Sequence, residues 1–139
     1  KFHVGPGDAM MVLGYPEGLA ANPSGFPIVR SGRVASYPLS PIAAFPTFLL
    51  DFRVFRGNSG GPVFMTEDLR RRPGLDAAPP AHFIAGMLAS QAMAGSERME
   101  VGVVTPAVYI RQTVALLDQA PAVPPTAPAA VEQAPAGQP

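Results

Sequence analysis

Short apolar, β-prone stretches, each bounded by glycine or proline, recur along the first 105 residues of the chain. Within residues 49–55 the later positions alternate between apolar and polar side chains, as in a strand with one buried face. Many short strands separated by Gly and Pro turns predict an all-β fold, an antiparallel barrel or a sandwich. The six expected strands cover residues 10–13, 28–37, 47–55, 62–65, 82–90 and 100–105.

The period of the apolar positions changes after the last expected strand. Thr105 suits the N-cap of a helix and Pro106 its first position. Apolar residues then recur at helical spacing, so we expect a C-terminal α-helix that packs through this stripe. The stripe consists of Ala107, Ile110, Val114 and Leu117. Residues 1–119 would form one domain, and residues 120–139, rich in Pro and Ala, an extended or disordered tail or linker.

Composition narrows the function classes. Hydrophobic residues make up 47% of the 139 positions and charged residues 14%, which is typical of a packed domain. Ten basic and ten acidic side chains leave no net charge, which argues against nucleic-acid binding through a basic surface. There is no cysteine, no apolar run of transmembrane length, and no His, Asp or Glu cluster with metal-ligand spacing, so neither a metal nor a cofactor is implied.

Residues 55–63 hold the most informative pattern, in which Ser59 stands between glycines with an apolar run on each side. Gly57 permits a turn in which its own N–H and that of Ser59 point to one spot, and Gly60 and Gly61 leave room for another chain. An exposed hydroxyl beside a cradle for an oxyanion is what a serine nucleophile needs. The alternative is an ordinary glycine-rich hairpin turn.

Residues 57–62 resemble the nucleophile motif of the chymotrypsin/trypsin-like serine endopeptidases, most closely the bacterial HtrA/Deg branch, in which Asn commonly precedes the serine. Asp51 suits the acidic position that precedes the motif there. Other segments are similar in order, and the resemblance covers roughly residues 5–118. These segments are residues 7–16, 29–36, 84–90 and 102–106.

The resemblance implies that the chain is the C-terminal, six-stranded barrel of a two-barrel peptidase. Ser59 would be the nucleophile, the Gly57 and Ser59 N–H groups the oxyanion hole, and Asn58 a spacer with its side chain turned away. The strand ending at Ala89, Ser90 and Gln91 would pair with a polypeptide substrate. Arg53 and the residues up to Arg56 would line the pocket for the side chain ahead of the cleaved bond. Arg53 in place of an acid argues against a preference for basic residues, and Ala89 favours small or medium apolar ones.

The resemblance assigns no catalytic base within this chain, because the family carries its His and Asp on the first barrel, ahead of the nucleophile. His3 and His82, the two histidines of the chain, do not occupy that position. Asp8 is similar to a structural Gly-Asp turn, and Asp51 could orient the nucleophile loop or be buried and paired. We therefore interpret the chain as a fragment that needs the N-terminal barrel as partner, is inactive alone, and self-associates through the apolar face it would expose.

Two other functions fit the same residues. The barrel could be an inactive pseudo-protease that only binds peptides, since fold alone does not imply catalysis. It could also be a structural β-domain in which the serine motif is accidental.

Overall fold

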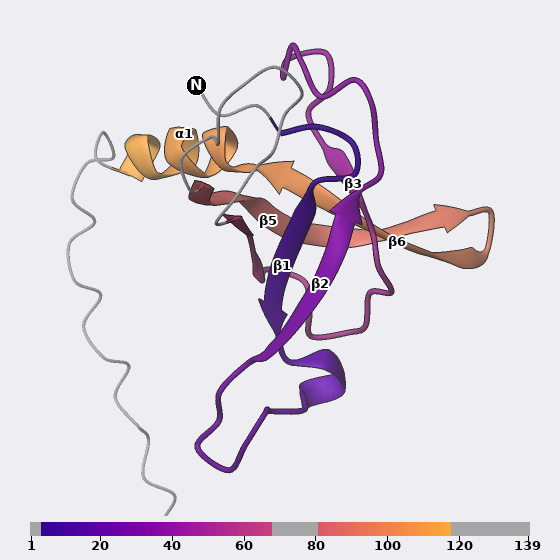
Figure 1. Ribbon diagram of the computed structural model, residues 1–139, viewed down its shortest axis with the longest axis vertical. Helices are drawn as coiled ribbons and strands as arrows, with labels where there is room; N and C mark the ends of the chain where they lie inside the picture. Colours follow the sequence, from indigo (N-terminus) through magenta and orange to yellow (C-terminus); the bar gives the residue numbers. More distant parts are fainter. Residues whose placement is uncertain (1–3, 68–80, 118–139) are drawn as a thin grey trace, which may run out of the picture.

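The computed structural model describes residues 4–67 and 81–117. In this part of the chain, six antiparallel strands form a closed barrel in the order β1-β2-β3-β6-β5-β4, followed by one helix (Figure 1). The expected all-β barrel with a C-terminal helix is thus confirmed. The elements are β1 (Ala9–Gly14), the short 3-10 helix η1 (Pro16–Gly18), β2 (Ile28–Val34), β3 (Phe48–Asp51), β4 (Pro62–Glu67), β5 (Ala81–Ala94), β6 (Glu97–Pro106) and α1 (Ala107–Leu117).

The core fills the inside of the barrel with apolar side chains from all six strands and from the segment after β3. In β1 the buried positions alternate with more exposed ones, as the pleat of a strand requires. Closed barrels of this size have interiors that side chains fill completely. The buried core comprises Met10, Val12, Val34, Phe48, Leu50, Phe52, Val54, Val63, Met65, Leu88 and Val104.

The third strand is shorter than the sequence indicates, because β3 ends at Asp51 rather than at residue 55. The alternation of burial nevertheless continues, since Phe52 and Val54 are buried while Arg53 between them is exposed. The alternation of side chains therefore predicted the buried residues correctly but overestimated the length of the hydrogen-bonded strand. The second strand is also shorter than expected and ends at Val34.

The last two strands are longer than expected. β5 and β6 continue as a hairpin to Ala94 and Glu97, with Gly95 at a φ of 62° in the turn, and this hairpin projects from the barrel (Figure 1). β6 also runs on to Pro106, so that Thr105 pairs with Met87 in the sheet. The expected N-cap at Thr105 is wrong, because a residue still paired in the ladder is not free to begin a helix.

Helix α1 is attached to the barrel by only part of its apolar stripe. Ala107 and Ile110 are half-buried, whereas Val114 and Leu117 are 52% and 70% exposed. The expected packing stripe is therefore confirmed for its first half and wrong for its second. No helix in the described part of the chain is long and apolar enough to cross a membrane. The expected tail at residues 120–139 lies outside the described residues.

Candidate functional site

Ser59 lies at an exposed corner of two consecutive turns between β3 and β4. The first turn is closed by the Asn58 N–H, which donates to the Phe55 carbonyl at 3.1 Å, and the second by the Gly61 N–H, which donates to the Asn58 carbonyl at 3.1 Å. Gly57 and Gly60 occupy the third position of their turns, each with a φ of 86°. This left-handed conformation at the third position is typical of a type II turn and favours glycine there. We refer to residues 55–61 as the double turn.

Asn58 anchors the double turn from inside the protein. Its side chain is fully buried, and its Oδ1 accepts a hydrogen bond from the Phe55 N–H at 3.1 Å. Its Nδ2 lies against Gly14, where a Cβ would approach it to 2.8 Å. The side chain does turn away from the exposed corner, as expected, but it fixes the turn and is more than a spacer.

The double turn is also in close contact with the end of β1 and with the loop that follows it. The Tyr15 N–H donates to the Gly57 carbonyl at 3.0 Å, and the Glu17 N–H donates to the Arg56 carbonyl at 2.7 Å. A Cβ at Gly57 would overlap the Tyr15 carbonyl oxygen, and one at Gly61 would overlap the carbonyl oxygen of Leu13. Glycine is thus required at both positions by close backbone approach, which local turn preferences alone would not reveal.

Three polar groups of the double turn remain available to a ligand. Gly57 and Ser59 are exposed, and neither of their N–H groups donates to an acceptor in residues 4–67 or 81–117. The Ser59 hydroxyl likewise has no hydrogen-bond partner among these residues. A hydroxyl and two free N–H donors within three residues can attack a carbonyl and hold the resulting oxyanion, provided that a base removes the hydroxyl proton.

Strand β5 runs past the double turn and is bonded to it. The Gly60 N–H donates to the Leu88 carbonyl at 2.8 Å, and the Leu88 N–H donates to the Gly61 carbonyl at 2.9 Å. The ladder between β4 and β5 ends at the pair Pro62 and Met87. From Ala89 onward, therefore, β5 has a strand on one side only within the described part of the chain. The predicted substrate-binding residues Ala89, Ser90 and Gln91 stand on this open edge, which can accept an added strand.

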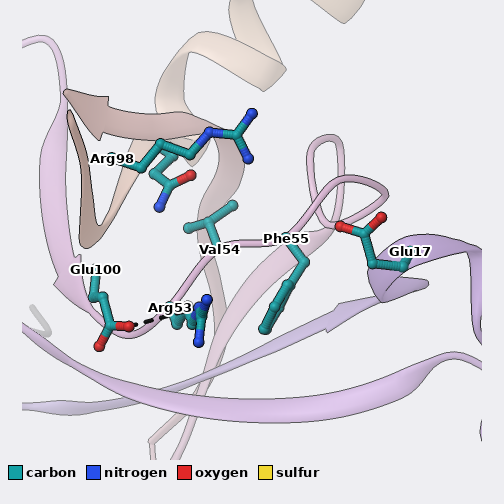
Figure 2. Close-up of a pocket in the computed structure, with 7 residues that line it drawn as sticks. Glu17, Arg53, Val54, Phe55, Arg98 and Glu100 are labelled. Carbon is teal, nitrogen blue, oxygen red and sulfur yellow. Dashed lines mark ion pairs between the residues drawn. The ribbon is translucent and has the colours of Figure 1, made fainter. Parts of the chain in front are cut away.

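A pocket of about 110 Å³ lies between the segment before the double turn and the β5–β6 hairpin. It brings together Arg53, Val54 and Phe55, which the sequence placed in a substrate pocket, and Gln91 from the predicted substrate strand. Arg53, Val54 and Phe55 are labelled in Figure 2. Arg53 Nε lies 3.6 Å from Glu100 Oε1, and Gln91 Nε2 donates to the Met99 carbonyl at 2.7 Å. The full lining is Glu17, Arg53, Val54, Phe55, Gln91, Arg98 and Glu100. Sequence reasoning missed Glu17, Arg98 and Glu100.

Phe55 and Glu17 line both this pocket and a second, larger hollow. The Arg53 guanidinium lies 5.1 Å from the centre of the ring and that of Arg30, on β2, lies 4.9 Å from it. Arg30 is also 5.5 Å from the ring of Phe52, and its buried Nη1 has no hydrogen-bond partner in the described part. The second hollow, of about 420 Å³, is lined by Pro16, Glu17, Leu19, Ile28, Val29, Arg30 and Phe55.

The residues excluded as a triad base or acid are not brought to Ser59. His82 pairs with Thr66, six residues along β5 from Leu88, which places it about 20 Å from the double turn. His3 lies outside the described residues. The Asp8 Oδ2 accepts a hydrogen bond from the Gly5 N–H at 2.8 Å, which confirms its structural role in a turn. Asp51 is exposed, so the suggestion that it is buried and paired is wrong.

No protein-family model, curated protein or solved structure matches this chain. The functional argument therefore depends on the barrel and on the geometry around Ser59. Within residues 4–67 and 81–117 there is also no group of three or more His, Asp or Glu side chains that could hold a metal ion.

Proposed function

We propose that this barrel carries the nucleophile of a serine endopeptidase, as one of the two barrels of a trypsin-like catalytic unit. The observation that carries the proposal is the double turn, in which an exposed Ser59 hydroxyl stands beside the N–H groups of Gly57 and Ser59, which have no acceptor among the described residues. Its conformation is held by close contacts with the loop after β1 and by the buried Asn58. Such precise support is what a preorganised oxyanion site requires.

In the proposed reaction, Ser59 Oγ attacks the carbonyl carbon of the scissile peptide while a histidine from outside the described residues takes the hydroxyl proton. The oxyanion accepts hydrogen bonds from the Gly57 and Ser59 N–H groups. The C–N bond then breaks, the histidine gives its proton to the leaving amine, and an acyl-ester remains on Ser59. Water, deprotonated by the same histidine, then attacks the ester carbon. The C–Oγ bond breaks, the histidine returns the proton to Ser59 Oγ, and the carboxylic acid is released. Loss of one oxyanion donor typically costs about 10²–10³ in rate.

The substrate would bind as an extended strand along the open edge of β5, at Ala89, Ser90 and Gln91. This edge begins one residue after Leu88, whose carbonyl and N–H are both hydrogen-bonded to the double turn. The side chain ahead of the cleaved bond would then enter the pocket that contains Arg53 and Gln91.

Labelling with a fluorophosphonate probe tests the proposal, because the probe bonds to a serine only when its hydroxyl is activated. We would compare residues 1–139 alone with the complete encoded protein and its Ser59→Ala variant. We expect labelling at Ser59 in the complete protein, located by peptide mass spectrometry, and little or none in residues 1–139 alone. Labelling of the isolated chain at the rate of an intact protease would show that the base lies within it.

A peptide-binding module without chemistry is the second candidate function. It is favoured by the absence of a histidine near Ser59 in the described part of the chain, together with the open β5 edge. If the complete protein binds peptides but is never labelled at Ser59, this function replaces the first. If Ser59→Ala leaves both binding and catalysis unchanged, the barrel is a structural domain.

A further inference from the structure

The pocket beside the double turn is charged rather than apolar. Of its seven lining residues, Arg53 and Arg98 are cationic, Glu17 and Glu100 are anionic, and Gln91 is an amide. The sequence had suggested a preference for small or medium apolar side chains on the strength of Ala89, which is not among the lining residues. The charges of the lining cancel, and this balance restricts what the pocket can accept.

The four charged groups are only partly paired with one another. Arg53 and Glu100 form a long ion pair at 3.6 Å, with 61% and 71% of their side chains exposed, and such exposed pairs contribute little. The side chains of Arg98 and Glu17 make no ion pair or hydrogen bond within residues 4–67 and 81–117. In Figure 2, Arg98 lies nearer to Val54 and Glu17 nearer to Phe55, toward the two ends of this part of the lining. The pocket therefore offers an unpaired donor group on one side and an unpaired acceptor group on the other.

We infer that this pocket selects substrates with a neutral side chain that both donates and accepts hydrogen bonds, namely the amide of glutamine or asparagine, ahead of the cleaved bond. The inference rests on the proposed function and specifies its substrate class. A lysine or arginine would pair with Glu17 but would face Arg98, whereas a glutamate would pair with Arg98 but would face Glu17. An apolar side chain would displace water from both groups without replacing its hydrogen bonds.

The size of the pocket agrees with this occupant. A volume of about 110 Å³ corresponds to about four water-sized groups, enough for a short unbranched side chain. Gln91 adds to the match, because its Nε2 is occupied by the Met99 carbonyl while its amide oxygen remains able to accept.

The test uses the complete encoded protein and four peptides that differ only in the residue ahead of the cleaved bond, which is Gln, Leu, Lys or Glu. We expect kcat/KM for the Gln peptide to exceed that of each other peptide by about three- to tenfold, because the pocket is open to water and its charges are screened. Arg98→Ala should raise the cleavage of the Lys peptide relative to Gln, and Glu17→Ala should raise that of the Glu peptide. Arg111→Ala and Glu97→Ala, which remove equal charges outside the pocket, should leave the ranking unchanged.

Binding provides a second readout that does not depend on turnover. In the Ser59→Ala variant, fluorescently labelled peptides with Gln at the same position should bind more tightly than those with Leu, again by about three- to tenfold. A Ser59-dependent activity that prefers Leu or Lys, with a profile insensitive to Arg98→Ala, would overturn the inference while leaving the proposed function intact. If the Ser59→Ala variant still cleaves the peptides and binds them without selectivity, the inference and the proposed function are both wrong.

Discussion

The double turn and helix α1 are held to the same barrel in opposite ways. The double turn exposes its polar chemistry, yet its backbone is hydrogen-bonded to β5 and to the loop after β1, and its Asn58 is fully buried. Helix α1 contains no fully buried residue, and its exposed face carries Val114, Leu116 and Leu117. A hollow lined by Ile84, Ala107, Ile110 and Arg111 runs beside it.

This difference indicates which positions of the chain should tolerate substitution. In the double turn the shape depends on backbone contacts that only glycine permits, so a single added carbon should be costly. On α1 the contacts with the barrel are few, a half-buried apolar stripe and the Tyr109 hydroxyl, which donates to the Ile42 carbonyl at 3.3 Å. Substitutions on its exposed face should therefore change association rather than folding. The predictions below proceed from the largest expected effect on stability to the smallest.

Gly57→Ala and Gly61→Ala should each reduce the free energy of unfolding by about 2–4 kcal/mol, because the new Cβ would overlap a backbone oxygen that cannot move freely. Gly60→Ala is the matched control, since Gly60 has the same positive φ as Gly57 but no atom within 4 Å of an added Cβ. Its cost should be about 1 kcal/mol. Urea unfolding measures the free energy of unfolding of all three variants. Equal losses at Gly57 and Gly60 would show that the positive φ, and not the close contact, determines the cost.

Asn58→Ala should cost about 1–3 kcal/mol, because it leaves the Phe55 N–H without its acceptor and opens a small cavity. Asn22→Ala provides the comparison, since Asn22 Oδ1 also accepts a backbone hydrogen bond, from Ser24, but at an exposed site. Its loss should stay near 0.5 kcal/mol. Thermal unfolding of both variants would contradict the anchoring role of Asn58 if the two shifts were alike.

Arg30→Gln should cost about 1–2 kcal/mol, because the guanidinium contacts the rings of both Phe52 and Phe55. Arg33→Gln, on the same strand, removes an exposed guanidinium that donates to the Gly7 carbonyl and should cost less. In the complete protein, Arg30→Gln should also slow the labelling of Ser59, because Arg30 contacts Phe55, the first residue of the double turn. Unchanged labelling with lowered stability would mean that Arg30 only supports the fold.

Val114→Lys and Leu117→Lys should change the free energy of unfolding by less than about 0.5 kcal/mol. They should, however, lower the average mass of the isolated chain in a light-scattering dilution series, because they place charge on an exposed apolar face. Leu19→Lys, an equally exposed position in the loop after η1, is the control. An unchanged mass for the helix variants would place the associating surface elsewhere.

The same contrast explains how far the sequence could predict the structure. The position of Gly57 before Ser59 was enough to predict the first turn, because turn conformation is a local property, but the second turn, with Gly60 at its third position, was not predicted. The burial of Asn58 could not be predicted, since its contact with Gly14 joins residues distant in sequence. Arg98 was missed because β5 and β6 extend beyond the expected strands, into a hairpin whose turn at Gly95 was not recognised. Glu100 lay within an expected strand, but its approach to Arg53 joins residues distant in sequence.

The bonds between the Gly60 and Gly61 backbone and Leu88 have a consequence for the order of events during synthesis. Leu88 is translated well after Ser59, and the barrel closes only when β3 pairs with β6, which ends at Pro106. Pairing over such separations is a late step in folding. We therefore expect a nascent chain that has emerged only to the end of β4 to hold Ser59 in an unshaped loop. The N–H groups of Gly57 and Ser59 would not be held in position until β6 has emerged from the ribosome.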